Sequence, residues 1–224
     1  MSFAEYFPVW DKLDKAQQKM LLDSVTERSA KAGTVLYTGG SDCLGLVVVK
    51  SGRLRAYSLS REGREITLYR LFERDICLMT SSCMMHNLQF DVTVEVEKDA
   101  EFWVIPPAVY RTLTEQSLAA ARYTNDLLAT RLSDVMWLME QIMWQSFDKR
   151  LAEFLLEESA LENTTVLNLT HEKIANHLGT AREVVTRMLR YFQGEGMVRL
   201  ARGTVELTDP QALARLADAE KPSK

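Results

Sequence analysis

The stretch NHLGTAREVVTRMLRYF, residues 176–192, decides the fold of the C-terminal third of the chain. Apolar residues recur at helical spacing on both sides of Gly179, which predicts two short helices joined by a glycine turn, a helix-turn-helix. In that motif the second helix enters the DNA major groove with its N-terminal residues. Here these residues are Arg182, Glu183 and, one turn later, Arg187, all outside the apolar face. The stretch therefore predicts a DNA-reading helix.

The three charged residues suit the reading of G·C pairs. Arginine presents a planar fork of donors to O6 and N7 of guanine, and a carboxylate accepts from the N4 amine of cytosine. We therefore expect base contacts from Arg182, Glu183 and Arg187, with the arginines offsetting the repulsion between the glutamate and phosphate. A structural alternative stays open: Thr180 and Glu183 have capping-box spacing, in which the glutamate bonds back to the helix start and the arginines form a solvated face.

Charge is segregated along the chain in favour of nucleic-acid binding. The 224 residues have a formal net charge of -4 and a pI near 5.5. Residues 164–203 nevertheless contain six basic and three acidic residues, a local charge of +3. A basic region in an acidic chain is the electrostatic pattern of a DNA-binding surface.

The residues around the motif extend the expected contact surface. Thr170 is a predicted N-cap of the first helix, and Thr180 of the second. Two short strands, 197–200 and 204–207, form a hairpin whose turn residue Arg202 is placed to reach phosphate. We include Thr170, Thr180 and Arg202 among the expected DNA-binding residues. His171 and His177 are expected to be exposed surface residues.

The region from about 30 to 107 is predicted to be β. Short runs rich in β-branched and aromatic residues alternate with turn pairs at even spacing, which favours a sandwich or barrel. The runs are 44–50, 54–60, 65–72, 91–97 and 101–106, and the turn pairs are Gly39-Gly40, Ser51-Gly52, Glu62-Gly63 and Lys98-Asp99. A short polar helix is predicted before this region, in DKAQQKMLLDSV.

A long helix is predicted after the β region, since no Pro or Gly occurs from there to residue 145. Apolar residues recur at alternating steps of three and four, the seam of a coiled coil, which predicts a homodimer. Asn125 on the seam would fix the register of a parallel pair. One amphipathic helix packed on its own β domain remains the alternative. The expected dimer-interface residues are Leu118, Asn125, Leu128, Leu132, Val135, Met139 and Ile142.

The stretch LTHEKIANHLGTAREVVTRMLRYFQGEGMVRL resembles the helix-turn-helix signature of the Crp/Fnr family of bacterial transcription regulators. The resemblance implies an α+β fold: an antiparallel β-roll (a double-stranded β-helix) for effector sensing at 1–109, a dimerisation helix at 110–145 and a winged helix-turn-helix at 146–224. It also implies that Arg182, Glu183 and Arg187 make the base contacts. The expected function is a homodimeric regulator of a palindromic double-stranded DNA site, with RNA polymerase as a partner if it activates.

Two effectors of that family are not expected. Its cyclic-nucleotide-binding members carry a Gly-Glu pair and an Arg-Ser or Arg-Thr pair, whereas Ile76-Cys77-Leu78 and Phe90-Asp91 occupy those places here. Asp91 would repel a phosphate, so we expect no cyclic AMP binding. An iron–sulfur cluster needs four ligands, and the chain has three cysteines, none before Cys43. The expected effector is an unidentified small molecule.

A cluster of soft side chains, Cys77, Cys83 and His86, permits a thiol, metal or haem-linked sensor with the same DNA output. Burial is the competing interpretation, because free cysteine is among the most buried residue types. Neither the spacing nor the number of ligands suits a zinc site, so no metal is assigned. From the family architecture we expect an effector pocket near Tyr123, Leu127 and Trp137.

Several other classes of protein find little support. No apolar run of about 18 residues and no signal peptide are present, which favours a cytoplasmic protein without a membrane partner. Three cysteines imply no disulfide framework. A cupin-type enzyme would need metal-binding histidines, yet the chain has none before His86. A helix-turn-helix that binds protein instead of DNA remains open, and the salt dependence of DNA affinity would separate the two.

Overall fold

The computed structural model describes residues 2–39, 43–84 and 91–218, with the backbone alone for 82–84. By contacts the chain divides into two units. One comprises Met1–Leu59 and Leu68–Met136, and the other comprises Ser60–Thr67 and Trp137–Lys224. Each unit has its own buried apolar cluster.

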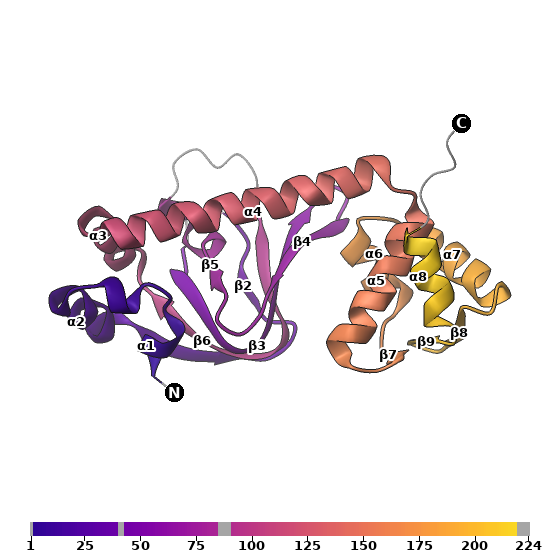
Figure 1. Cartoon of the computed structure of the whole chain (residues 1–224), viewed down its shortest axis with the longest axis horizontal. Coiled ribbons are helices and arrows are strands. Elements are labelled where there is room, and N and C mark those ends of the chain that lie inside the picture. The colour runs from indigo at the N-terminus through magenta and orange to yellow at the C-terminus, as the bar shows by residue number, and fades with distance from the viewer. Residues whose placement is uncertain (1, 40–42, 85–90, 219–224) are drawn as a thin grey trace. The chain divides into compact units, whose positions relative to one another are not determined.

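An antiparallel sheet forms the centre of the first unit (Figure 1). Its long strands β3 and β6 pair along most of their length, with β1 beside β6 and β4 beside β3, while β2 pairs with β6 and β5 with β3. The predicted antiparallel β architecture is confirmed. The strands are β1 Thr26–Ala30, β2 Val35–Tyr37, β3 Leu46–Leu59, β4 Glu65–Leu71, β5 Ile76–Cys77 and β6 Thr93–Ile105.

Two predicted turns, Ser51-Gly52 and Lys98-Asp99, are wrong, because each lies inside a long strand. The register between β3 and β6 shifts around Ser51 and Arg53, so the chain continues through an irregularity rather than reversing. Gly52 has a φ of +88°, and a Cβ there would collide with the Asp99 carbonyl oxygen. A glycine is therefore required where the backbone of β6 approaches this position. Four predicted runs thus form two bulged strands.

The helices that precede the sheet in the sequence pack into its core. The predicted first helix is confirmed as α2 Lys15–Ser24, and its N-cap Asp14 accepts a hydrogen bond from the Gln17 amide at 2.8 Å. Before it, α1 Phe3–Tyr6 places the rings of Phe3 and Tyr6 against Trp103 of β6, and Trp10 of the 3₁₀ turn η1 Trp10–Lys12 packs against Phe3. These rings cover one part of the sheet and join the core.

The helix predicted from 110 to 145 is two helices, α3 Pro107–Gln116 and α4 Leu118–Trp144 (Figure 1). Ser117 separates them with extended backbone angles, φ −119° and ψ 110°. Its hydroxyl accepts a hydrogen bond from the Ala120 amide at 3.3 Å, so it caps the second helix. A serine can interrupt a helix in this way because its side chain competes with the backbone for hydrogen bonds.

The second unit contains the predicted winged helix-turn-helix (Figure 1). Its small sheet has the order β7-β9-β8, and its core includes fully buried Leu155, Val185, Leu189 and Phe192. A last helix, absent from the sequence expectations, packs against α5. The elements are α5 Phe147–Glu162, β7 Val166–Leu167, α6 His171–Leu178, α7 Arg182–Gly194, β8 Val198–Ala201, β9 Thr204–Leu207 and α8 Pro210–Asp218.

Candidate nucleic-acid interface and sensor cavity

Helix α6 is capped at both ends. Thr170 is the N-cap of α6, as predicted, and accepts a hydrogen bond from the Lys173 amide at 3.1 Å. The helix ends at Gly179, whose φ of +67° is the left-handed conformation that glycine adopts without strain. Arg150 of α5 donates to the Leu178 carbonyl oxygen at 2.6 Å, which satisfies an acceptor at the helix end.

Helix α7 has two opposite faces. Val185, Leu189 and Phe192 are fully buried in the core of the second unit. Arg182, Glu183 and Arg187 are exposed. The three side chains that the sequence singled out for base contacts therefore lie on the solvent side of the first turns of this helix.

The predicted N-cap Thr180 is wrong, because the N-cap of α7 is Ala181. The Thr180 amide donates to the Ala175 carbonyl oxygen at 3.1 Å, so Thr180 belongs to the turn that closes α6. The capping box between Thr180 and Glu183 does not form. Within the described residues no side-chain hydrogen bond holds the Glu183 carboxylate, which leaves it available to a ligand.

Neither histidine of the motif is an exposed surface residue, which corrects the sequence expectation. His171 is half-buried, and its Nδ1 lies 2.8 Å from the Thr186 hydroxyl of α7. Burial, with smaller contributions from Arg182 and Arg190, lowers the pKa of His171. In the same unit the Nδ1 atom of His177 lies 2.9 Å from the Thr67 hydroxyl. Both rings therefore help to hold the motif in place.

The wing follows the prediction closely. Strands β8 and β9 pair from Val198 with Leu207 to Ala201 with Thr204, which leaves Arg202 and Gly203 as the turn. Arg202 is exposed at its tip. Arg199 and Glu206 form an ion pair of 3.0 Å across the two strands. The wing thus presents one unpaired arginine and one paired arginine within the described residues.

Helix α4 exposes a long series of apolar side chains. Tyr123 and Leu127 pack against the core of the first unit, whereas the seam residues Leu132 and Met139 are 64% and 46% exposed. An apolar series of this length rarely faces water on a monomer. The exposed large apolar residues of α4 are Leu118, Leu128, Leu132, Met136, Trp137, Met139, Ile142, Met143 and Trp144, while Val135 is half-buried and Asn125 is exposed.

The structure describes only part of the cluster of Cys77, Cys83 and His86. Cys77, in β5, is a free and fully buried cysteine, and burial raises the pKa of its thiol. A buried, protonated thiol is a poor nucleophile, which disfavours Cys77 as a redox sensor. The side chain of Cys83 and all of His86 lie outside the described residues. Cys43 is disulfide-bonded, which the number of cysteines did not indicate.

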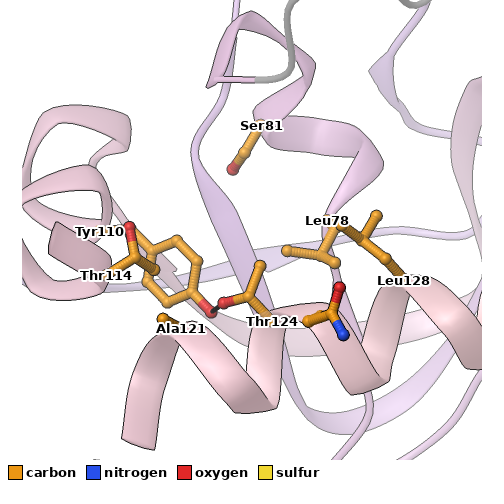
Figure 2. A pocket seen from close by; sticks show the side chains of 8 residues that line it. Leu78, Ser81, Tyr110, Thr114, Ala121, Thr124 and Leu128 are labelled. Atoms are coloured by element: carbon orange, nitrogen blue, oxygen red, sulfur yellow. Dashed lines mark hydrogen bonds between the residues drawn. The ribbon is translucent and has the colours of Figure 1, made fainter. Parts of the chain in front are cut away.

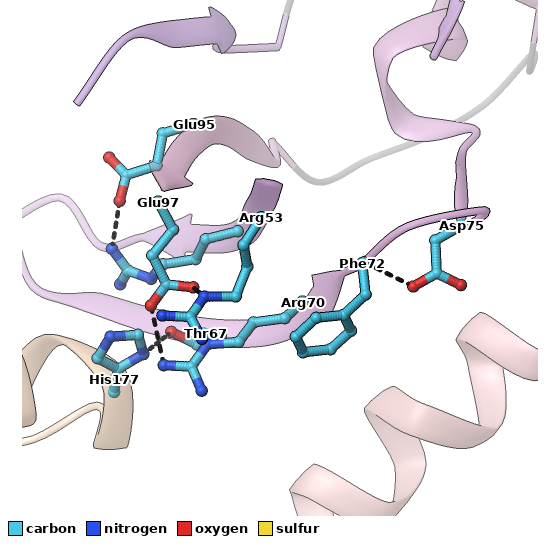
Figure 3. Close-up of polar contacts among 9 residues, drawn as sticks. Arg53, Thr67, Arg70, Phe72, Asp75, Glu95, Glu97 and His177 are labelled. Atoms are coloured by element: carbon cyan, nitrogen blue, oxygen red, sulfur yellow. Dashed lines mark hydrogen bonds and ion pairs between the residues drawn. The ribbon is translucent and has the colours of Figure 1, made fainter. Parts of the chain in front are cut away.

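The arginines of the sheet are engaged by carboxylates (Figure 3). Arg53 Nε lies 2.7 Å and Arg70 Nη2 lies 2.9 Å from the two oxygens of Glu97, and Arg55 Nη1 lies 2.9 Å from Glu95. Arg53 and Arg55 are buried. Their charge is already balanced within the sheet, so these arginines do not form a free site for phosphate.

A cavity of about 330 Å³ opens among α3, α4 and the 3₁₀ segment η2 Met79–Met84 (Figure 2). The expected pocket residues Tyr123, Leu127 and Trp137 do not line it. Sequence reasoning missed most of its wall, although two hydroxyl residues one turn apart on α3, Tyr110 and Thr114, were a signal. The cavity is lined by Leu78, Ser81, Tyr110, Thr114, Ala121, Thr124, Asn125 and Leu128.

In residues 2–39, 43–84 and 91–218 no group of three or more His, Cys, Asp or Glu side chains is arranged to hold a metal ion. Over the same ranges no helix has both the length and the apolar content needed to cross a lipid bilayer.

Comparison with known proteins agrees with this arrangement. A Crp-like helix-turn-helix domain matches residues 149–216, and a cyclic nucleotide-binding domain matches residues 27–117. The cyclic AMP receptor protein of Thermus thermophilus is 24% identical over 210 residues, which cover 94% of this chain and 96% of that protein. The transcriptional activator FnrA of Stutzerimonas stutzeri is 26% identical over 209 residues, 88% of this chain and 83% of that protein.

A solved structure gives the strongest of these likenesses. The crystal structure of a transcriptional regulator of the Crp/Fnr family from Eubacterium rectale is 54% identical, covers 96% of this chain and 100% of that chain, and superposes with a TM-score of 0.94. The order of sheet, long helix and winged helix-turn-helix agrees with it. The chain therefore belongs to the Crp/Fnr family of transcription regulators, whose members bind DNA through this motif and are not enzymes.

Proposed function

We propose that the chain acts as a homodimer on a two-fold symmetric DNA site, with one α7 helix in the major groove of each half. The observation that carries the proposal is the position of Arg182, Glu183 and Arg187 on the exposed face of α7, opposite its buried apolar face. The arginines pair with guanine edges and the glutamate with the cytosine amine, so each half-site contains G·C pairs. The half-site centres are about 34 Å apart.

The surroundings of α7 supply contacts that position it on the duplex. In this proposal the phosphate backbone is contacted by Arg202 at the wing tip, Thr170 at the start of α6 and Thr180 in the turn before α7. Contacts of this kind set register and affinity, whereas the base contacts set the sequence. Affinity therefore falls steeply with salt, which would separate DNA binding from recognition of a protein by the same motif.

The exposed apolar series of α4 supports the homodimer. Leu132→Asp places a charge in the middle of the proposed seam, so we expect the dimer to dissociate at micromolar concentrations. Ser133→Asp introduces the same charge beside the seam and serves as the control. Sedimentation velocity measures both. A Leu132→Asp protein that sediments like wild type would remove α4 as the dimer interface.

We also propose an effector other than a cyclic nucleotide or an iron–sulfur cluster. The sheet arginines are already paired with Glu95 and Glu97, and Asp91 carries the wrong charge for phosphate. Whether RNA polymerase is a partner depends on whether the bound regulator activates. Equilibrium dialysis of reduced protein against cyclic AMP and cyclic GMP tests the first exclusion, since binding of either would overturn it.

Selection of bound duplexes from a randomised DNA pool, with reduced protein and no added ligand, tests the central proposal. Recovery of a two-fold symmetric site with G·C pairs in each half would support both the dimer and the base contacts. An asymmetric site, or one without G·C pairs, would contradict them. If no site is recovered at low salt, the selection is repeated with protein whose two dimer helices are joined by a linker, and a second failure rejects the proposal.

A further inference from the structure

We propose that the cavity among η2, α3 and α4 binds a compact uncharged molecule that has an apolar body and a polar group able both to donate and to accept hydrogen bonds. A carboxamide or an alcohol on a small ring has this chemistry. The assignment of this molecule as the effector rests on the proposed regulatory function, whereas its binding to the cavity does not.

Ser81 is the first observation that points to a ligand. The residue is 1% exposed, and within the described residues its hydroxyl oxygen has no hydrogen-bond partner. Figure 2 shows this hydroxyl directed toward the space beside Tyr110. A buried hydroxyl without a partner is costly, and a bound polar group would remove that cost. Ser81 also interrupts the helical geometry of η2, with φ −117° and ψ 28°.

The opposite wall supplies acceptors. The Thr124 hydroxyl donates to the Ala120 carbonyl oxygen at 2.8 Å, so the 2.7 Å contact between Tyr110 and Thr124 has Tyr110 as the donor (Figure 2). The Tyr110 oxygen therefore keeps its capacity to accept. Thr114 likewise donates to the Arg111 carbonyl oxygen at 2.8 Å and keeps an acceptor lone pair. A ligand that accepts from Ser81 and donates to this wall satisfies both sides.

The uncharged lining of the cavity does not suit an ion. No acidic or basic side chain is among its lining residues in the described structure. An anion or cation entering it would lose hydration without gaining a counter-charge. Leu78, Ala121 and Leu128 instead offer an apolar surface. The volume of about 330 Å³ lies at the small end of ligand pockets, which suits a single substituted ring.

Isosteric probes test the charge selectivity without any mutation. Benzamide is neutral, benzoate is its anionic counterpart, and benzamidinium is its cationic counterpart. Phenol and benzyl alcohol, whose hydroxyl groups both donate and accept, extend the neutral set. Saturation-transfer NMR and titration calorimetry on the full-length protein, in the absence of DNA, measure binding. We expect neutral probes to bind with dissociation constants on the order of 1 mM and the two ions to bind at least tenfold more weakly.

Two variants locate the binding. Ser81→Ala removes one hydroxyl with little change in volume and should weaken benzamide binding by about threefold to tenfold. Ser133→Ala makes the same chemical change on the exposed surface of α4, outside the cavity, and should leave binding unchanged. Ala121→Phe fills the cavity and should abolish the benzamide signal.

The outcomes separate this proposal from the proposed DNA function. Absence of binding by all three neutral probes, equal binding of benzoate or benzamidinium, or equal effects of the two serine variants would each overturn the cavity assignment. None of these results bears on DNA recognition, because no DNA is present. If Ala121→Phe fails to fold, the comparison of isosteres and the Ser81→Ala result decide the question.

Discussion

Two sets of arginines in this chain have opposite surroundings. In the sheet, Arg53 and Arg70 share the carboxylate of Glu97 and are largely buried. On α7, Arg182 and Arg187 are exposed and, within the described residues, have no carboxylate partner. The contrast shows that an arginine belongs to the fold when the chain supplies its counter-charge, and can serve recognition when the counter-charge is left to a ligand.

Removal of the carboxylate that the two sheet arginines share should have the largest effect. Glu97→Ala leaves two buried guanidinium groups without it, so we expect the free energy of unfolding to fall by about 3–5 kcal/mol. Glu101→Ala, on the same strand, removes a carboxylate that is 52% exposed and paired with Lys50, and is the control. Urea denaturation measures both. Equal losses would show that the buried ion pairs of Glu97 contribute no more to the free energy of unfolding than the exposed pair of Glu101.

Removal of an arginine from the recognition helix should have the next largest effect. Arg187→Ala should leave folding intact, weaken specific DNA binding by about 1–3 kcal/mol and relax the preference at one G·C pair. Arg190→Ala, one turn along α7 and also exposed, is the matched control. Titration of the selected site and its single-base variants measures the effect. A uniform loss on every sequence would instead identify Arg187 as a phosphate contact.

A smaller effect is expected from His171, which lies between the two extremes because it is half-buried near Arg182 and Arg190. Its lowered pKa means that the folded chain binds fewer protons than the unfolded chain. Stability is therefore retained above the unfolded pKa of about 6.5 and is lost as the pH falls below it. His171→Asn should flatten this loss in urea unfolding between about pH 7.5 and 5.5. An identical slope in the variant would show that other groups cause it.

The smallest effect is expected on the wing. The Arg199–Glu206 pair spans 3.0 Å, but its side chains are 70% and 36% exposed, so solvent screens it. Arg199→Ala should change the free energy of unfolding by less than about 1 kcal/mol. Thermal unfolding of Arg199→Ala beside Arg202→Ala provides the measurement. A loss comparable with that of Glu97→Ala would show that exposed ion pairs stabilise this fold as much as buried ones do.

The DNA-reading unit was predictable because its signals are local. Gly179 marks the turn, Thr170 is the N-cap, and the apolar residues of α7 recur at helical spacing within a few residues of one another. The wrong N-cap, Thr180, arose because its amide closes the preceding helix instead of opening the next. Such a choice between neighbouring turns depends on three-dimensional geometry that spacing alone does not specify.

The sensor unit was less predictable because its features depend on distant residues. Gly52 looks like a turn in the sequence, but its pairing with a strand more than forty residues away keeps it inside β3. The ion pairs of Glu95 and Glu97 likewise join separate strands. The cavity combines Ser81, Tyr110 and Asn125 from three segments, and no short pattern brings them together. Composition predicts that these segments form a sheet and helices, but not which side chains meet.

The hydrogen bond from Arg150 to the Leu178 carbonyl oxygen has a consequence for protein engineering. It ties the end of α6 to α5, a helix that precedes the helix-turn-helix. A chimera that transplants only residues 170–194 into another scaffold would leave this carbonyl oxygen without its donor and the turn without its support. The portable module therefore begins at α5 and includes α8, which packs against it. Exchange of DNA specificity between regulators should accordingly be made at Ser146, before α5, rather than at Thr170.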